Sequence, residues 1–433
     1  MTNGPFARER NQPMTQRSAL VDLSALRNLP SLLAIERDEA PQRTRGRQLL
    51  WGLLSLALGG ALSMGTALLR GHHVMGTTSE VPWGVLIATY IFFVASTSGL
   101  CRVGSLGHVF GFERFAPVAK KATFLGLVLL LIGFAVIASE LERPFLLLKW
   151  AVLSPNPRSP IWWMGTLYGV YAAVLVAELY FQLRGDHSRA RTAGIVSLVA
   201  AVAAQSNLGA VLGLAHARPA WYGPFLPVYF IALALMCGAA LLVLTVWAED
   251  FFTHEGRLRP RHRLLMDSLR ALLALFVGVV MLFSFWRVLT GVYGAHPRQQ
   301  EVTLAFLLGP LFVSFWLGEV FLGLVVPFTL LLGVARHKTK ALALAAAFTL
   351  LGVFVMRYNL IISGQMLSLK PLAGRLEALA SYAPAFKGAP AGFLSYTPSL
   401  VELGVVVGAM AMAVLAYVAG SRVLRLDQEA HHD

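Results

Sequence analysis

Charged residues are scarce in this chain. Of its 433 residues only 13% are Asp, Glu, Lys or Arg, whereas 57% are hydrophobic, and the mean hydropathy is +0.65. A soluble domain keeps about a quarter of its residues charged to cover its surface. The deficit excludes an ordinary soluble protein of this size and favours an integral membrane protein.

Metal and haem ligands are also lacking where a cofactor would need them. The two cysteines, Cys101 and Cys237, lie in separate apolar segments and provide neither a disulfide framework nor a zinc or iron–sulfur site. A haem held between helices needs axial histidines inside the spans, but all eleven histidines fall in loops, in tails or at segment ends. We therefore expect no haem and no metal in this chain.

What the sequence does contain is a series of apolar segments of spanning length, since about 20 residues cross the hydrocarbon core. They predict an all-α, polytopic transmembrane helical bundle of about ten spans. The eighth segment is too long for a straight span, and Pro310 and Pro327 offer break points. The expected spans lie near residues 49–69, 82–101, 121–140, 161–183, 193–215, 225–248, 266–291, 303–334, 341–363 and 398–421.

The net charge of +14 predicts topology rather than nucleic-acid binding, because the basic residues lie between the apolar segments and not on one face. With the N-terminus inside, and Lys121 counted at the boundary, the inner segments hold 24 of the 36 Lys and Arg. This excess predicts that both termini are cytoplasmic, and we expect the membrane to be a bacterial inner membrane. We expect a basic N-terminal tail (1–48), a transmembrane domain (49–421) that carries the function, and a C-terminal tail (422–433).

Two outer connections, 141–160 and 365–397, are long and mix aromatic residues and proline with few charges. Such stretches are typical of interfacial segments that cap a bundle or of a docking surface for a partner outside the membrane.

Ionisable residues inside the spans need a partner or a function, because a charge at the bilayer centre costs at least about 2.5–3.5 kcal/mol. Glu178 lies toward the inner half of the fourth span, and Glu319 lies near the middle of the eighth. For both residues two roles remain open. Each is either part of a proton relay or a neutral carboxyl that forms a hydrogen bond to a neighbouring helix. Five more gather at the outer side, where they line a polar pocket or pair with one another: Glu140, Arg143, Arg287, Arg357 and Glu402.

Amides and a tyrosine occur at the same outer depth. Gln205 and Asn207 interrupt the fifth span. The ninth span ends in Arg357, Tyr358 and Asn359, and Gln365 follows it. A quinone needs donors to its two carbonyls, an apolar slot and a group that passes protons. The pattern fits a quinone site, although polar groups also hold helices together.

A set of short motifs resembles the NrfD/PsrC (polysulfide reductase membrane subunit) family in the same order, from about residue 50 to 422, closest to its ten-span HybB/DsrP-like branch. The matching stretches are Val81–Val85, Glu140–Pro144, Gln205–Gly209, Ala220–Trp221 with Pro224 and Pro227, Glu319 with Pro327, Arg357–Asn359 with Gly364–Gln365, and Tyr396–Pro398 with Glu402.

This resemblance implies a pair of four-helix bundles with peripheral helices, which bind menaquinone or ubiquinone near the outer face. It implies electron exchange with a ferredoxin-like iron–sulfur subunit and further redox subunits, so the chain is a non-autonomous part of a quinone oxidoreductase complex. By position, Glu140 and Arg143 are the candidate catalytic residues. The candidate quinone-binding residues are Gln205, Asn207, His216, Arg357, Asn359 and Gln365; Glu178 and Glu319 form the candidate proton path.

The sequence departs from the family pattern at two places. The fifth-helix histidine falls on Ala204, for which His216 is a possible substitute, and Glu140 replaces the commoner Asp while Glu142 replaces a Gly. Two other functions therefore remain open. One is a proton-coupled transporter that uses Glu178 and Glu319, and the other is a structural anchor that docks a redox complex without binding quinone.

Overall fold

The computed structural model describes residues 41–141, 143–253, 258–294, 297–367, 393–424 and 426. Most of the expected N-terminal tail, residues 368–392 of the second outer connection and the end of the C-terminal tail lie outside the described residues.

The described part of the chain is helical and has no named β-strand, which confirms the predicted all-α class. Ten helices there are long and apolar enough to cross a membrane, which confirms the predicted number of spans. The spans are formed by α3 (Pro41–Arg70), α4 (Val85–His108), α5 (Ala116–Glu140), α7 (Pro160–Leu183), α8 (His187–Gly213), α9 (Phe225–Thr253), α10 (Pro260–Tyr293), η3 with α12 (Ser314–Val325 and Val326–Leu332), α13 (Thr339–Ser363) and α15 (Leu400–Val423).

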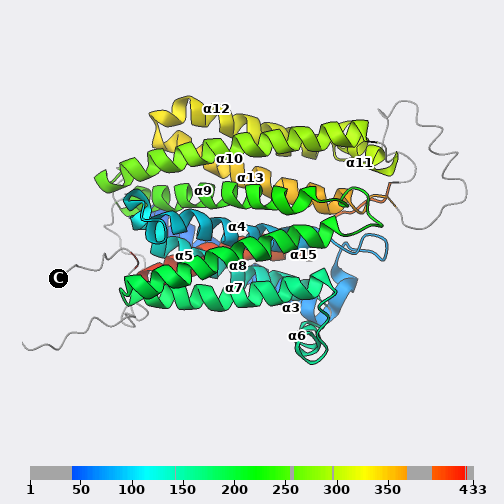
Figure 1. Cartoon of the computed structure of the whole chain (residues 1–433), viewed down its shortest axis with the longest axis horizontal. Helices are drawn as coiled ribbons and strands as arrows, with labels where there is room; N and C mark the ends of the chain where they lie inside the picture. Colours follow the sequence, from blue (N-terminus) through cyan, green and yellow to red (C-terminus); the bar gives the residue numbers. More distant parts are fainter. Residues whose placement is uncertain are drawn as a thin grey trace, which may run out of the picture.

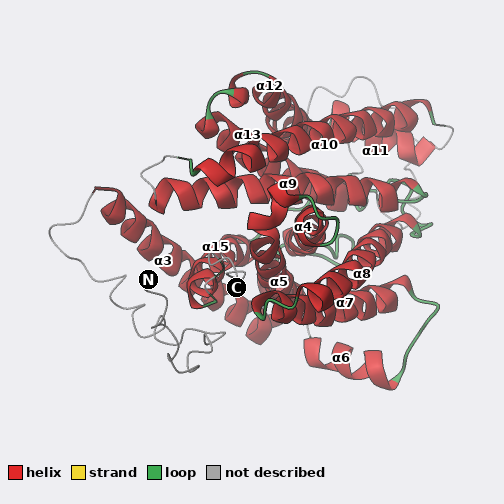
Figure 2. Ribbon diagram, turned by 60° about the vertical axis from the view of Figure 1, so that its left-hand side comes forward, coloured by secondary structure: helices red, strands yellow, loops and turns green. Residues whose placement is uncertain are grey.

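The helices form two four-helix bundles with two peripheral helices, as the family resemblance implies. In the first bundle, α4 and α7 each pack against both α5 and α8. In the second, α13 packs against α9, η3 and α12, while α10 closes the ring against α9 and α12. Helices α3 and α15 pack together on the outside of α5 (Figures 1 and 2).

The two bundles meet where the backbones of α4 and α9 touch. A Cβ atom built on Gly99 would overlap the carbonyl of Ala234, and one built on Gly238 would overlap the backbone of Gly99. Only glycine permits this approach, which leaves α4 buried along nearly its whole length. Polar groups on α4 therefore face protein on all sides.

The long helices run side by side, so the molecule has two ends (Figure 1). We call the end with Pro41 and Leu424 the terminal end and the opposite one the distal end. The short helices α6 (Pro144–Leu153) and α11 (Pro297–Leu307) lie at the distal end. The predicted topology places the terminal end in the cytoplasm.

The overlong eighth segment is broken at one of its two prolines. A turn at Gly309–Pro310 separates α11 from η3, so residues 297–307 form a helix of their own. At Pro327 the helix continues without a break. The residues before it, Ser314–Val325, have π-helical hydrogen bonding, whose wider turns accommodate a residue without an N–H donor.

This break corrects the expected depth of Glu319. The sequence placed it near the middle of a span over 303–334, but its span begins at Ser314 and Glu319 lies in the second turn from the distal end. Other boundaries also move. Helices α3, α8 and α10 begin at Pro41, His187 and Pro260 rather than near 49, 193 and 266, and α4 ends at His108 rather than near 101.

Candidate functional site

The structure divides the predicted site residues among several clusters and leaves three of them apart. Arg357 and Gln205 belong to one cluster at the junction of the bundles. Glu140 belongs to a second at the distal end of the first bundle, and Asn359 and Glu319 belong to a third inside the second bundle. Glu178 organises a fourth.

The first group, the Arg357 cluster, surrounds the buried guanidinium of Arg357 on α13. Its three guanidinium nitrogens have no hydrogen-bond partner in the part of the chain that the structure describes. Its Cζ lies 3.9 Å from the centroid of the Phe230 ring. Tyr168 lies within electrostatic range and donates a hydrogen bond to Gln205 Oε1 at 3.1 Å. A buried, unpaired cation among aromatic rings and an amide is equipped to bind a neutral carbonyl or an anion.

The second group, the Glu402 cluster, holds two carboxyl groups at the distal end. Glu402 caps α15 and accepts hydrogen bonds from the Tyr396 hydroxyl at 2.6 Å and from the Gly76 amide at 2.7 Å. Burial, with the hydrogen bond to Glu402, raises the pKa of Tyr396, so its hydroxyl keeps its proton. Glu140 lies within electrostatic range of Glu402, yet both of its carboxylate oxygens are buried without a hydrogen-bond partner among the described residues.

Gln365 connects the two groups by holding the segment before α4. Its amide accepts a hydrogen bond from the Trp83 amide at 3.0 Å and donates one to the Trp83 carbonyl at 2.8 Å. The Trp83 ring stacks on Trp221 with centroids 5.3 Å apart, and Trp221 donates to the Leu360 carbonyl at 2.7 Å. Because its amide is used in this way, Gln365 is placed to position Trp83.

The third group, the Glu319 cluster, contains a buried ion pair. Arg287 on α10 donates to Glu319 Oε1 at 2.9 Å, and Asn359 on α13 donates to Glu319 Oε2 at 3.0 Å. Ser314 donates to Asn359 at 2.5 Å. Arg287 thus pairs with Glu319 and not with the outer carboxyls, which the sequence alone had left open.

Glu178 organises the fourth group near the terminal end, the Glu178 cluster, to which every helix of the first bundle contributes. Thr123 on α5 and Gln182 on α7 donate to Glu178 Oε1 at 3.0 and 3.1 Å, and Ser197 on α8 donates to Oε2. His108, the last residue of α4, places Nε2 2.9 Å from Oε1, outside hydrogen-bond geometry. Glu178 and Glu319 thus lie in the third helix of their respective bundles.

Several polar residues between these clusters were missed by sequence reasoning. Arg102 on α4 donates to the Ala201 carbonyl at 3.0 Å, and its other two guanidinium nitrogens are buried with no hydrogen-bond partner within the described ranges. Tyr171 donates to the Thr97 carbonyl at 3.2 Å, and Cys101 lies 3.4 Å from Ser197. Arg102 was assigned to a basic inner loop, because the apolar run ends at Cys101, although α4 continues to His108.

Three predicted residues lie away from the clusters. Arg143 is exposed at the start of α6, and His216 is exposed and packs its ring against Tyr222. Asn207 donates to the Pro160 carbonyl at 3.0 Å and so ties α8 to the start of α7. Their assignment to a quinone site stays a prediction that this geometry does not strengthen.

No group of three or more His, Cys, Asp or Glu side chains able to hold a metal ion occurs among the described residues. The polar clusters are built from Arg, Tyr, Gln, Asn, Ser, Thr, His and Glu side chains, which are able to form hydrogen bonds.

Comparison with known proteins identifies relatives over most of the chain. A selenate reductase subunit of Mesobacillus selenatarsenatis is 23% identical over 86% of this chain and 92% of its own length. The Hdr-like menaquinol oxidoreductase integral membrane subunit of Archaeoglobus fulgidus is 26% identical over 82% and 87%. A putative dimethyl sulfoxide reductase membrane subunit of Halobacterium salinarum is 28% identical over 89% and 93%.

These relatives are, by name, subunits of reductase or oxidoreductase complexes, and two of the names specify the membrane. The sequence model of the family described as polysulphide reductase, NrfD, matches residues 73–368. This range includes both four-helix bundles and leaves out the peripheral helices α3 and α15. The chain is therefore a multi-pass membrane protein that belongs to the NrfD family.

Proposed function

We propose that this chain is the quinone-reacting membrane subunit of a multi-subunit respiratory redox complex. It exchanges electrons between menaquinone or ubiquinone and a ferredoxin-like iron–sulfur subunit at the distal end, and it carries no haem or metal. The relative from Archaeoglobus is named as a menaquinol oxidoreductase subunit, which supports this substrate class.

The observation that carries the proposal is the pair of unsatisfied buried groups, the guanidinium of Arg357 and the carboxyl of Glu140. An orphaned buried polar group costs about 1–3 kcal/mol or more, so one that persists in a folded protein is expected to meet a ligand or water. These groups fit a quinone, which offers two carbonyl acceptors on an apolar ring.

In this site, Arg357 would bind and orient one carbonyl, supported by Tyr168 and Gln205. Glu140 would hold or release a proton for the quinone, and Gln365 would fix the segment at Trp83. A quinone supplies two-electron, two-proton chemistry when it is bound. Arg143, Asn207, Asn359 and His216 remain predicted members of the site.

The proton path that we propose joins the distal and terminal ends through buried polar side chains. Tyr229 lies within electrostatic range of Glu319, Arg287 and Arg357, which connects the second bundle to the Arg357 cluster. From Tyr168, the groups Tyr171, Arg102 and Ser197 lead toward Glu178. Glu319 already has Arg287 as a permanent counter-charge, whereas Glu178 is bonded by neutral hydroxyl and amide groups and faces His108, which is charged only when it is protonated. Glu178 is therefore the better suited of the two to load and unload a proton.

The partner and location follow the same proposal. The predicted topology places the distal end outside a bacterial inner membrane and both termini in the cytoplasm. The short helix α6 exposes Phe145, Trp150, Val152 and Leu153 at the distal end, where it would lie in the lipid interface or against a partner subunit.

Glu140→Gln in the purified complex tests the proposal, because it keeps shape and hydrogen bonding but cannot titrate. We expect normal assembly of the complex. Electron transfer to quinone should be slower when quinone is limiting, whereas transfer to a soluble artificial acceptor should be normal. Glu80→Gln, at another distal position, is the matched control. Wild-type quinone turnover in Glu140→Gln would remove Glu140 from the site and favour the structural anchor.

A further inference from the structure

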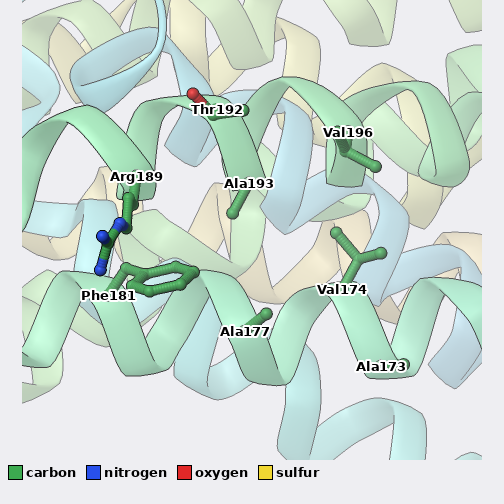
Figure 3. A pocket seen from close by; sticks show the side chains of 8 residues that line it. All are labelled: Ala173, Val174, Ala177, Phe181, Arg189, Thr192, Ala193 and Val196. Atoms are coloured by element: carbon green, nitrogen blue, oxygen red, sulfur yellow. The ribbon is translucent and has the colours of Figure 1, made fainter.

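A groove of about 460 Å³ lies between α7 and α8 near the terminal end, remote from the distal clusters described above. Figure 3 shows its lining side chains converging from the two helices: Ala173, Ala177 and Phe181 from α7, and Arg189, Ala193 and Val196 from α8. Apolar residues on both sides of it, including Val170, Val176, Ile195 and Val199, are exposed. The groove therefore opens onto the membrane.

The floor of the groove is apolar and made of small residues. Along α7 it continues toward the distal end over Gly169 and Gly165, both exposed and with open space where a Cβ would lie. From Ala177 to Gly165 the track spans twelve helical residues, about 18 Å. Half of the hydrocarbon core is about 15 Å thick, so the track matches one extended acyl chain in one leaflet.

A positively charged side chain, Arg189, lies at the terminal end of the groove. The Arg189 side chain is 72% exposed, and its Cζ lies 6.0 Å from the centroid of the Phe181 ring (Figure 3). Its acidic neighbour Asp186 lies 3.5 Å away and also caps α8. Exposed pairs of this kind contribute little, so a phosphate can take the place of Asp186. Arg184, stacked on Tyr180 at 4.6 Å, adds a second positive charge nearby.

We propose that this groove is a binding site for an anionic phospholipid of the leaflet at the terminal end. One acyl chain lies along Ala173, Ala177 and Ala193, and the headgroup phosphate is held by Arg189. A phospholipid fits better than a partner helix because its phosphate offers a negative charge to Arg189, whereas an apolar transmembrane helix offers none.

The site also has a consequence for the interior, since its walls are shared with the Glu178 cluster. Ala177 precedes Glu178 and Val196 precedes Ser197, so the same two helix turns face the lipid on one side and the cluster on the other. An ordered acyl chain would hold α7 and α8 together at this depth.

Native mass spectrometry of the full chain in nanodiscs of equal parts phosphatidylglycerol and phosphatidylcholine tests the proposal. We expect the wild type to retain phosphatidylglycerol in about fivefold preference, as one basic side chain near the surface provides. Arg189→Gln should lose the preference, and the matched control Arg336→Gln, an exposed arginine at the same end, should keep it.

A second variant tests the groove independently of the charge. Ala177→Leu fills the floor and should lower retention of any phospholipid at this site, whereas Val176→Leu, on the lipid-facing side next to it, should not. Equal retention of both lipids by the wild type, or an unchanged preference in Arg189→Gln, would overturn the proposal. So would loss of a partner subunit from the complex in Ala177→Leu, because the occupant would then be a protein helix.

Discussion

Replacing Arg357 by methionine distinguishes a role of Arg357 in quinone binding from a role in stabilising the fold. In the absence of a ligand, a buried and unpaired guanidinium costs several kcal/mol, offset by about 2 kcal/mol from its contact with Phe230. Methionine fills similar space without a charge, so Arg357→Met should leave the stability of the chain unchanged or raise it. The same variant should lose quinone-dependent turnover.

The magnitude of that loss follows from the contact removed. A hydrogen bond from a charged group contributes about 1.5–3 kcal/mol, which corresponds to a loss of roughly 10- to 150-fold at limiting quinone. The assay pairs the thermal midpoint of the purified complex with quinone turnover.

Arg287→Met is the matched control, because Arg287 has a carboxylate partner. Removing it leaves Glu319 buried with Asn359 alone, which should cost about 3–5 kcal/mol of stability. If Arg357→Met were destabilised as strongly as Arg287→Met and kept its turnover, Arg357 would be structural and the proposed site would be wrong.

Three further outcomes are expected. Glu178→Gln should preserve electron transfer to quinone but lower the membrane potential generated per electron in liposomes, and His108→Gln should do so to a smaller extent. Gln365→Ala should cost about 1–3 kcal/mol for each buried Trp83 group left unpaired, seen as a lower thermal midpoint. Gln365→Glu should keep the bond from the Trp83 amide and lose those to the Trp83 and Ile361 carbonyls. Gly238→Val should prevent accumulation of folded protein in the membrane, measured by fluorescence-detected chromatography, because its side chain overlaps α4.

The fold was predictable because it depends on composition at spanning length. Lipid leaves helices as the only structures that satisfy the backbone in an apolar segment, so hydropathy alone predicts the number and order of spans. The errors fall where polar residues interrupt an apolar run. The extension of α4 beyond Cys101 to His108 places Arg102 inside the bundle, and the break at Pro310 moves Glu319 toward the distal end.

The clusters were only partly predictable, because sequence gives the depth of a residue in its span but not the direction that its side chain faces. Depth correctly grouped Glu140 with Glu402. It did not distinguish Arg357, which faces Phe230 without a carboxylate, from Arg287, which faces Glu319. Helix rotation, set by close contacts such as that of Gly99 with Gly238, decides between them.

The central claim is that the distal polar clusters bind quinone, and direct measurement of bound quinone tests it. The complex would be purified from membranes, extracted with solvent and assayed for quinone per chain, in the wild type and in Arg357→Met. We expect tightly bound menaquinone or ubiquinone in the wild type and a loss of roughly 10-fold or more in Arg357→Met, with the other subunits still present. Equal quinone content in the two proteins, with equal quinone turnover, would contradict the claim.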